Sequence, residues 1–184
     1  STLKAQHEIL PLDGLRQALG NGIEVEYARG YVGDPNNEVE GVPAPYDLAE
    51  QRSPQELRDE AVTKAREADY VVVFGGLNKS WHQDCEGADR KEYGLPYGQD
   101  SLIEALADVN KNLVYVNISG NPVAMPWKDK VPAIVQGWFL GSVAGEALAD
   151  VLTGRTNPSG KLPYTWMAAL DDVAAHQLGT YPGT

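Results

Sequence analysis

"YVVVFG", residues 70–75, carries the strongest fold signal in the chain. The run is short, continuous and apolar, and its centre consists of β-branched valines. A strand with one face in water alternates apolar and polar residues. A continuous apolar run of this length is instead typical of a strand buried on both faces in a parallel sheet. Because parallel strands are joined by crossover connections, helices are expected to flank the sheet.

Helix patterns lie on both sides of this run. Upstream, "SPQELRDEAVTKAREAD" places Ser53 at a helix N-cap, Pro54 in the first turn and Glu56 three residues after the cap. This is a capping box with a proline where its missing N–H costs nothing, so it predicts the start of a helix. Downstream, "SVAGEALADVLTG" predicts a helix with Ser142 as its cap and Gly154 as its stop. Further helices are predicted over 12–19 and 99–110, strands over 22–30, 112–120 and 132–139, and a loop over 31–52.

The order of these elements predicts a single α/β domain over residues 1–184. Alternating helices and strands build a mainly parallel open sheet with helices packed on it, which is a three-layer αβα sandwich. In such sheets ligands bind beyond the carboxyl ends of the strands. The connection 74–99 follows the carboxyl end of the "YVVVFG" strand, and it is far longer than the median of about 4–6 residues. A functional loop is therefore expected there.

Composition excludes several classes of function. The net charge of −11 and the pI of about 4.6 leave no basic face for nucleic acid or for an anionic membrane surface. No apolar run approaches the length of a membrane span. Cys85 is the single cysteine, which excludes an internal disulfide and any site built from several thiolates. Neither nucleic acid nor a membrane is expected as a partner.

Cofactor and metal sites are not expected either. Gly75 and Gly76 follow a strand, but no G-x-G-x-x-G motif continues from them, so a dinucleotide is not predicted. The chain also lacks the G-x-S-x-G elbow of serine hydrolases. His82, Asp84, Cys85 and Glu86 are spaced as in no established metal site.

The loop "FGGLNKSWHQDCEGADRKEYGLPYGQ" (74–99) combines carboxylates with an aromatic residue. Glycoside hydrolysis uses two carboxyl groups across a sugar, one of them a general acid with a raised pKa. The indole of Trp81 is suited to stack on a sugar, and Gly87 lets the backbone approach a site. On the residues alone Glu86 is one candidate acid among four, and a solvated loop carboxylate is the plain alternative. Its competitors are Asp84, Asp89 and Glu92.

Several motifs in a fixed order resemble one known family. They are E-G-x-D-R-x-x-x-x-L-P-x-x-Q, S-G-x-P-V-x-x-P-W, G-x-x-x-G-x-A-x-A-D-V-L-x-G and N-P-S-G-K-L-P, and "ILPLDGLRQAL" with "VEYARG" fits the start. Together they resemble the second domain of glycoside hydrolase family 3, the β-glucosidase family, over nearly the whole chain. The order and spacing of the set are more specific than any single motif.

The resemblance implies a retaining, exo-acting β-glycosidase, most of all a β-glucosidase, built from a (β/α)₈ barrel followed by this sandwich. In the family the aspartate nucleophile lies on the barrel, and the glutamate of E-G-x-D-R is the general acid/base. That position falls on Glu86. The resemblance further implies that Trp81, His82 and Gln83 line the side of the leaving group, and that Asp89 and Arg90 hold the loop.

The chain contains no barrel, so it is expected to be a fragment of a larger enzyme that is inactive alone. Its expected partners are a β-linked glucoside or oligosaccharide and the N-terminal barrel domain of the same protein, with no cofactor. A non-catalytic module that binds carbohydrate or docks on the barrel is the alternative, and an unrelated flavodoxin-like binding domain is a third. The resemblance and the acidic chain without an internal disulfide favour the periplasm or secretion over the cytoplasm.

Overall fold

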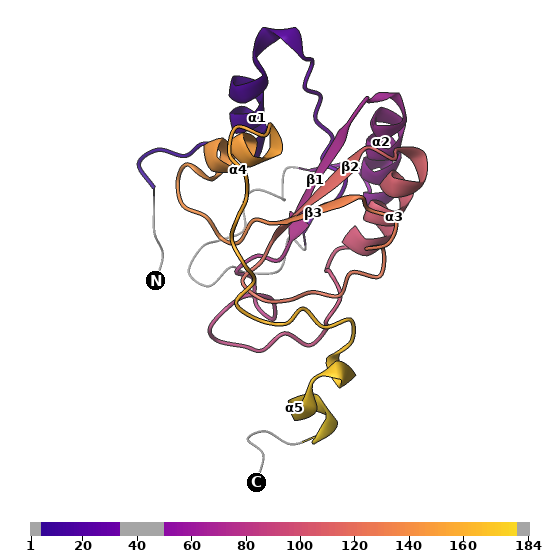
Figure 1. Cartoon of the computed structure of the whole chain (residues 1–184). Helices are drawn as coiled ribbons and strands as arrows, with labels where there is room; N and C mark the ends of the chain where they lie inside the picture. Colours follow the sequence, from indigo (N-terminus) through magenta and orange to yellow (C-terminus); the bar gives the residue numbers. More distant parts are fainter. Residues whose placement is uncertain (1–4, 34–49, 180–184) are drawn as a thin grey trace.

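The computed structural model describes residues 5–33 and 50–179. Its centre is a sheet of three strands in the order β1 (Val71–Gly76), β2 (Leu113–Ile118) and β3 (Ala133–Gln136) (Figure 1). All the pairings are parallel, with Val73 beside Tyr115 in the first and Tyr115 beside Ile134 in the second. The buried parallel strand predicted from "YVVVFG" is confirmed, one residue further along the chain.

Helices lie on both sides of this sheet, which confirms the predicted αβα class. Helices α2 and α3 pack together on one side, and α1 and α4 pack together on the other (Figure 1). The helices are α1 (Pro11–Leu19), α2 (Pro54–Glu67), α3 (Gln99–Val109), α4 (Ala144–Leu152) and α5 (Ala174–Gln177), with 3₁₀ turns at Gly20–Gly22 and Leu170–Asp172.

The predicted capping box begins α2. The Ser53 hydroxyl accepts the Glu56 N–H at 3.2 Å, and the Glu56 carboxylate accepts the Ser53 N–H at 2.7 Å. Two N–H groups that would lack a helical partner are therefore satisfied. The buried face of the helix consists of Leu57, Ala61 and Ala65, at the spacing of successive turns.

The core lies between the sheet and the helices α2 and α3. Tyr115 and Trp127 are fully buried and meet edge to face, with ring centroids 4.6 Å apart. The Trp127 indole N–H donates to Asp100 on α3 at 2.7 Å, so the polar end of the ring is satisfied. Burial raises the pKa of Tyr115, whose hydroxyl donates to the buried Asn117 at 3.1 Å.

Helices α1 and α4 touch through their backbones. A Cβ added to Gly14 would lie 2.1 Å from the Gly145 carbonyl oxygen, and one added to Gly145 would lie 2.1 Å from the Leu10 carbonyl oxygen. Only glycine permits this approach at either position. The Gly145 N–H donates to the Ile9 carbonyl at 2.9 Å and fastens the start of α4 to the segment before α1.

The strand predicted over 22–30 is wrong. Residues 23–30 form no strand, although their apolar and polar residues alternate as in one. Side chains of neighbouring helices hold the segment instead. Arg16 of α1 donates to the Val25 carbonyl at 3.3 Å, and Lys64 of α2 pairs with Glu26 at 2.8 Å. The loop predicted over 31–52 lies largely outside the described residues.

The start of the last long helix also differs from the prediction. α4 has Val143 as its N-cap residue, without a side-chain capping bond, so Ser142 is not the cap. The Ser142 carbonyl accepts the Ile9 N–H at 2.8 Å, which ties it to the start of α1. The predicted stop is confirmed, because Gly154 follows the C-cap with φ of +75°. Strand β3 is shorter than the predicted 132–139.

Candidate active site loop

The segment 77–98 joins β1 to α3 and lies at the carboxyl end of the sheet, below it in Figure 1. We call it the β1–α3 loop. Its first half folds back on itself, since the Asp84 N–H donates to the Asn78 carbonyl at 2.9 Å and the Gln83 N–H donates to the Ser80 carbonyl at 3.0 Å. Its length is thus used to build a compact local structure.

Gln83 lies inside this compact half. Its side chain is 8% exposed, its amide oxygen accepts the Asn78 N–H at 3.0 Å, and its amide N–H donates to the Tyr97 hydroxyl. The amide group is therefore engaged within the loop. The neighbouring Ser80 is also buried.

Two anchors attach the loop to residues 119–122, which follow β2 and which we call the 119–122 turn. The Asp84 carboxylate accepts the Gly120 N–H at 2.7 Å on one oxygen and the Asn121 side-chain amide on the other. The Arg90 guanidinium donates to the Pro122 carbonyl at 2.5 Å. Glu86 lies in the exposed stretch between the two anchors.

Trp81 and Gly87 lie next to each other beside Glu86. A Cβ added to Gly87 would approach the six-membered ring of the Trp81 indole to 2.6 Å, so the backbone runs directly against the indole. Trp81 is 45% exposed and leaves much of its surface to solvent. The loop thus presents a carboxylate and an aromatic surface together.

His82 lies at the edge of the indole, with ring centroids 6.0 Å apart. Its φ of 63° is in the left-handed region, which is unusual for a residue other than glycine. The His82 Nδ1 lies 3.1 Å from the Asp89 carbonyl oxygen, so the two halves of the loop meet there. The Asp89 side chain itself is exposed.

Arg90 is half-buried between Tyr93 of its own loop and the 119–122 turn. Its guanidinium carbon lies 5.8 Å from the centre of the Tyr93 ring, and the Tyr93 hydroxyl donates to the Met167 carbonyl at 2.6 Å. Loss of solvent lowers the pKa of Arg90, against the nearby negative charge of Asp84. Arg90 and Tyr93 therefore fasten the second half of the loop.

Sequence reasoning missed the role of Asp84 and of the 119–122 turn. Asp84 was one of four equivalent loop acids, and its partners lie far away along the chain, so no local pattern connects them. One signal was available, because "SGNP" (119–122) lies at the carboxyl end of the buried strand predicted over 112–120. The ends of parallel neighbours meet at one edge of a sheet, which places that turn beside the loop.

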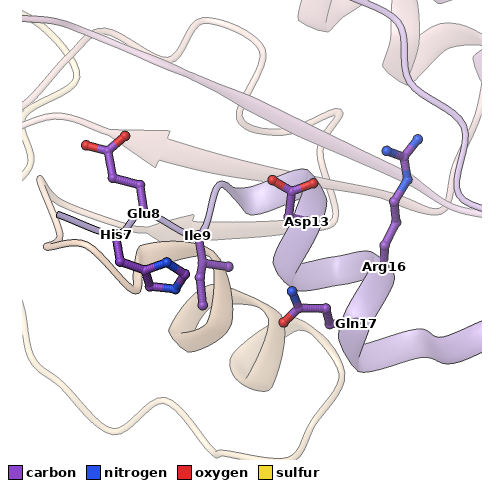
Figure 2. Close-up of a pocket in the computed structure, with 6 residues that line it drawn as sticks. All are labelled: His7, Glu8, Ile9, Asp13, Arg16 and Gln17. Carbon is purple, nitrogen blue, oxygen red and sulfur yellow. The ribbon is translucent and has the colours of Figure 1, made fainter. Parts of the chain in front are cut away.

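Two hollows of the described surface are lined by residues other than Glu86. One of about 180 Å³ lies at the end of β1 against Tyr31, Leu77 and Tyr97. A wider one of about 500 Å³ lies along the segment before α1 and the helix itself, as Figure 2 shows. Its lining residues are His7, Glu8, Ile9, Asp13, Arg16 and Gln17. Glu86 instead lies on an open surface.

The described residues provide two further facts about ligands and membranes. Within 5–33 and 50–179, no three histidine, cysteine, aspartate or glutamate side chains gather in a way that could hold a metal ion. Within the same ranges, no helix is long and apolar enough to span a bilayer.

Comparison with known proteins assigns the family. The model of the glycosyl hydrolase family 3 C-terminal domain matches residues 1–182. β-Glucosidase BoGH3A of Bacteroides ovatus is 50% identical over all of this chain and 24% of its own length. β-Glucosidase B of Emericella nidulans is 45% identical over 74% of this chain and 16% of its own length.

Solved structures agree in fold. The family 3 β-glucosidase of Bifidobacterium adolescentis superposes with a TM-score of 0.74 at 32% identity, over 97% of this chain and 23% of that one. The β-glucosidase of Kluyveromyces marxianus gives 0.65 at 38% identity, over 68% of this chain and 15% of that one. This chain spans a quarter or less of the length of these relatives. It therefore belongs to the glycosyl hydrolase family 3 C-terminal domain family.

Proposed function

We propose that this chain is the part of a retaining β-glucosidase that supplies the general acid/base, and that Glu86 is that residue. The observation that carries the proposal is the place of Glu86 on the β1–α3 loop. It is exposed at the carboxyl end of the sheet, beside the indole of Trp81 and between the anchors Asp84 and Arg90. The relatives named β-glucosidases supply the substrate class, a β-linked glucoside.

The chemistry needs a second carboxylate that this chain does not provide. In a retaining mechanism the nucleophile lies about 5–5.5 Å from the acid/base, on the other side of the scissile bond. We place it on a (β/α)₈ barrel domain of the same polypeptide, which would approach the open face around Glu86. Glu86 would first protonate the leaving oxygen and later take a proton from the attacking water.

The residues next to Glu86 would contact the leaving group or support those that do. Trp81 is 45% exposed, so a sugar or aryl group can stack on its ring, and the His82 ring meets the indole in an edge arrangement. Gln83 would support these residues indirectly, since its amide bonds hold the first half of the loop in its folded form. Asp89 and Arg90 would keep the second half in place, Arg90 by its bond to the 119–122 turn.

The test compares two leaving groups in the full-length enzyme. In Glu86→Ala, kcat/KM for an alkyl β-glucoside should fall by about 10²–10⁴-fold, because an alkoxide leaves only when it is protonated. For a 2,4-dinitrophenyl β-glucoside kcat/KM should change little, since that group leaves without a proton. Azide should accelerate turnover of the aryl substrate, because it attacks the glycosyl-enzyme without a general base.

Glu92→Ala is the matched control, since Glu92 is an exposed carboxylate of the same loop. It should leave both substrates unaffected. Unchanged hydrolysis of the alkyl glucoside by Glu86→Ala would remove the acid/base proposal.

The exposed Trp81 also fits the alternative, a carbohydrate-binding or docking module without a catalytic group. That module would show a raised KM in Trp81→Ala and unchanged kinetics in Glu86→Ala. Both proposals expect a raised KM in Trp81→Ala, so the kinetics of Glu86→Ala separate them.

A further inference from the structure

Asp84 connects the β1–α3 loop to the buried interior of the sheet. The Asn121 carbonyl, in the turn that Asp84 holds, accepts the Ser119 hydroxyl at 2.7 Å. The Ser119 hydroxyl in turn accepts the amide of Asn117 on β2 at 2.6 Å. Ser119 and Asn117 are fully buried. The carboxylate is thus attached to a turn that is itself fixed to the core.

A neighbouring strand fixes the same turn from its other side. Gln136 of β3 donates to the Ser119 carbonyl at 2.7 Å, and its amide oxygen accepts the Asn117 amide at 2.7 Å. The turn is therefore held by side chains of both β2 and β3. A group bonded to such a turn has little freedom to move relative to the sheet.

Asp84 precedes Glu86 by two positions, and the Arg90 anchor follows it. Both anchors end on the 119–122 turn, so the ends of the short stretch that carries Glu86 are held at one place on the sheet edge. The remaining freedom of Glu86 is that of its own side chain and of the few residues between the anchors. Both oxygens of Asp84 already accept hydrogen bonds, which marks this carboxylate as a means of attachment.

We propose that Asp84 is a positioning residue for Glu86 and sets the reach of the acid/base from its own domain. The inference rests on the proposed function, since it needs Glu86 to transfer the proton. Hydrogen bonds to a carboxylate are about twice as strong as neutral ones, so Asp84 is a firm anchor. Misplacement of a catalytic group by about 1 Å can cost about 10²-fold in rate.

The experiment is the leaving-group comparison on Asp84→Ala in the full-length enzyme. We expect kcat/KM for the alkyl β-glucoside to fall by about 10²-fold. The kcat/KM for the 2,4-dinitrophenyl β-glucoside should fall by no more than about threefold, because the dinitrophenolate group leaves without an acid. Azide should restore part of the turnover of the aryl substrate. A change that only loosened the fold would reduce both substrates alike, so the ratio reports on the position of Glu86.

Two further variants make the result specific. Asp84→Asn keeps an oxygen for the Gly120 N–H, and a rotated Asn121 amide can accept from the new NH₂ group, so most of the alkyl activity should return. Asn121→Ala removes one of the two bonds and leaves Asp84 in place, so it should give a smaller loss of the same kind. If thermal unfolding shows that Asp84→Ala does not fold, Asn121→Ala still tests the inference.

Lys91→Ala is the matched control, because Lys91 is an exposed side chain of the same loop. It should leave kcat/KM for both substrates unchanged.

The outcomes separate this inference from the function on which it rests. If Glu86→Ala depends on the leaving group but Asp84→Ala and Asn121→Ala reduce both substrates equally, or neither, the positioning role is overturned. If Glu86→Ala shows no such dependence, the acid/base proposal fails and this inference fails with it.

Discussion

Replacing Gly87 with alanine should separate the activity of the proposed full-length β-glucosidase from the stability of this domain. Gly87 is the glycine next to Glu86, and its backbone runs against the indole of Trp81. The added methyl group would lie 2.6 and 2.7 Å from two ring carbons of the indole. Carbon atoms in contact are about 3.5–4.0 Å apart, so the ring or the backbone must move by about 1 Å.

The half-exposed Trp81 is the part that can give way. Its ring can rotate towards solvent for about 0.5–1.5 kcal/mol of rotamer strain. The alanine also reduces the conformational entropy of the unfolded chain, which offsets about 0.4–1 kcal/mol of this strain, so the free energy of unfolding should change by no more than about 1 kcal/mol. The displacement occurs directly beside Glu86, the proposed acid/base, so kcat/KM for an alkyl β-glucoside should fall by about 10- to 100-fold.

Urea unfolding and steady-state kinetics measure the two quantities. A double-mutant cycle with Trp81→Ala tests the cause, because removal of the ring makes room for the methyl group. Gly87→Ala should cost activity when Trp81 is present and little when it is absent. Gly22→Ala is the control, since its Cβ would meet nothing within 4 Å. An equal cost in both backgrounds would refute the steric argument, and a large loss of stability with unchanged activity would refute the separation.

Three other predictions concern the domain itself. Gly145→Ala should reduce the free energy of unfolding by about 3 kcal/mol in urea denaturation, because its Cβ would lie 2.1 Å from the Leu10 carbonyl oxygen; a loss below about 1 kcal/mol would contradict the close helix contact. The hydrogen bond from the Ser53 N–H lowers the pKa of Glu56 in the folded state. The ionised carboxylate therefore stabilises the fold at pH values above its unfolded pKa of about 4.5, and this stabilisation is lost as the pH falls through the lower pKa of the folded state. In Glu56→Gln the free energy of unfolding should depend less steeply on pH in the acid range. The same pH dependence as in the unchanged chain would argue against the capping box. The chain alone should not hydrolyse an aryl β-glucoside above background, and clear turnover would reveal a nucleophile within it.

Elements specified by neighbouring residues could be predicted from the sequence. The capping box of Ser53 and Glu56 and the apolar run of β1 contain their own explanation within a few positions, and both are confirmed. The segment 22–30 has the pattern of a strand but is held by Arg16 and Lys64 on helices. Those contacts were not visible in its own residues, and they are why the strand prediction failed.

The site divides in the same way. The motif order gave Glu86 as the candidate acid/base, and that role remains a prediction for the kinetic test. The attachment of Asp84 to Gly120 and Asn121 joins loops that follow two different strands. The parallel pairing of those strands brings the loops together. The local sequence contains no sign of this pairing, so it does not distinguish Asp84 from the other acidic residues of the loop.

The contact between α1 and α4 orders events during synthesis on the ribosome. Strands β1, β2 and β3 lie in the sheet in the order in which they are translated, so each can pair with its neighbour as it emerges. Helix α1 is made before all of them, yet its partner Gly145 is made after them. Until Ala144–Leu152 has left the ribosome, α1 lacks the helix on which it packs in this domain, and that contact face stays open to chaperones or proteases. The contact between α1 and α4 is therefore among the last of the described helix contacts to form.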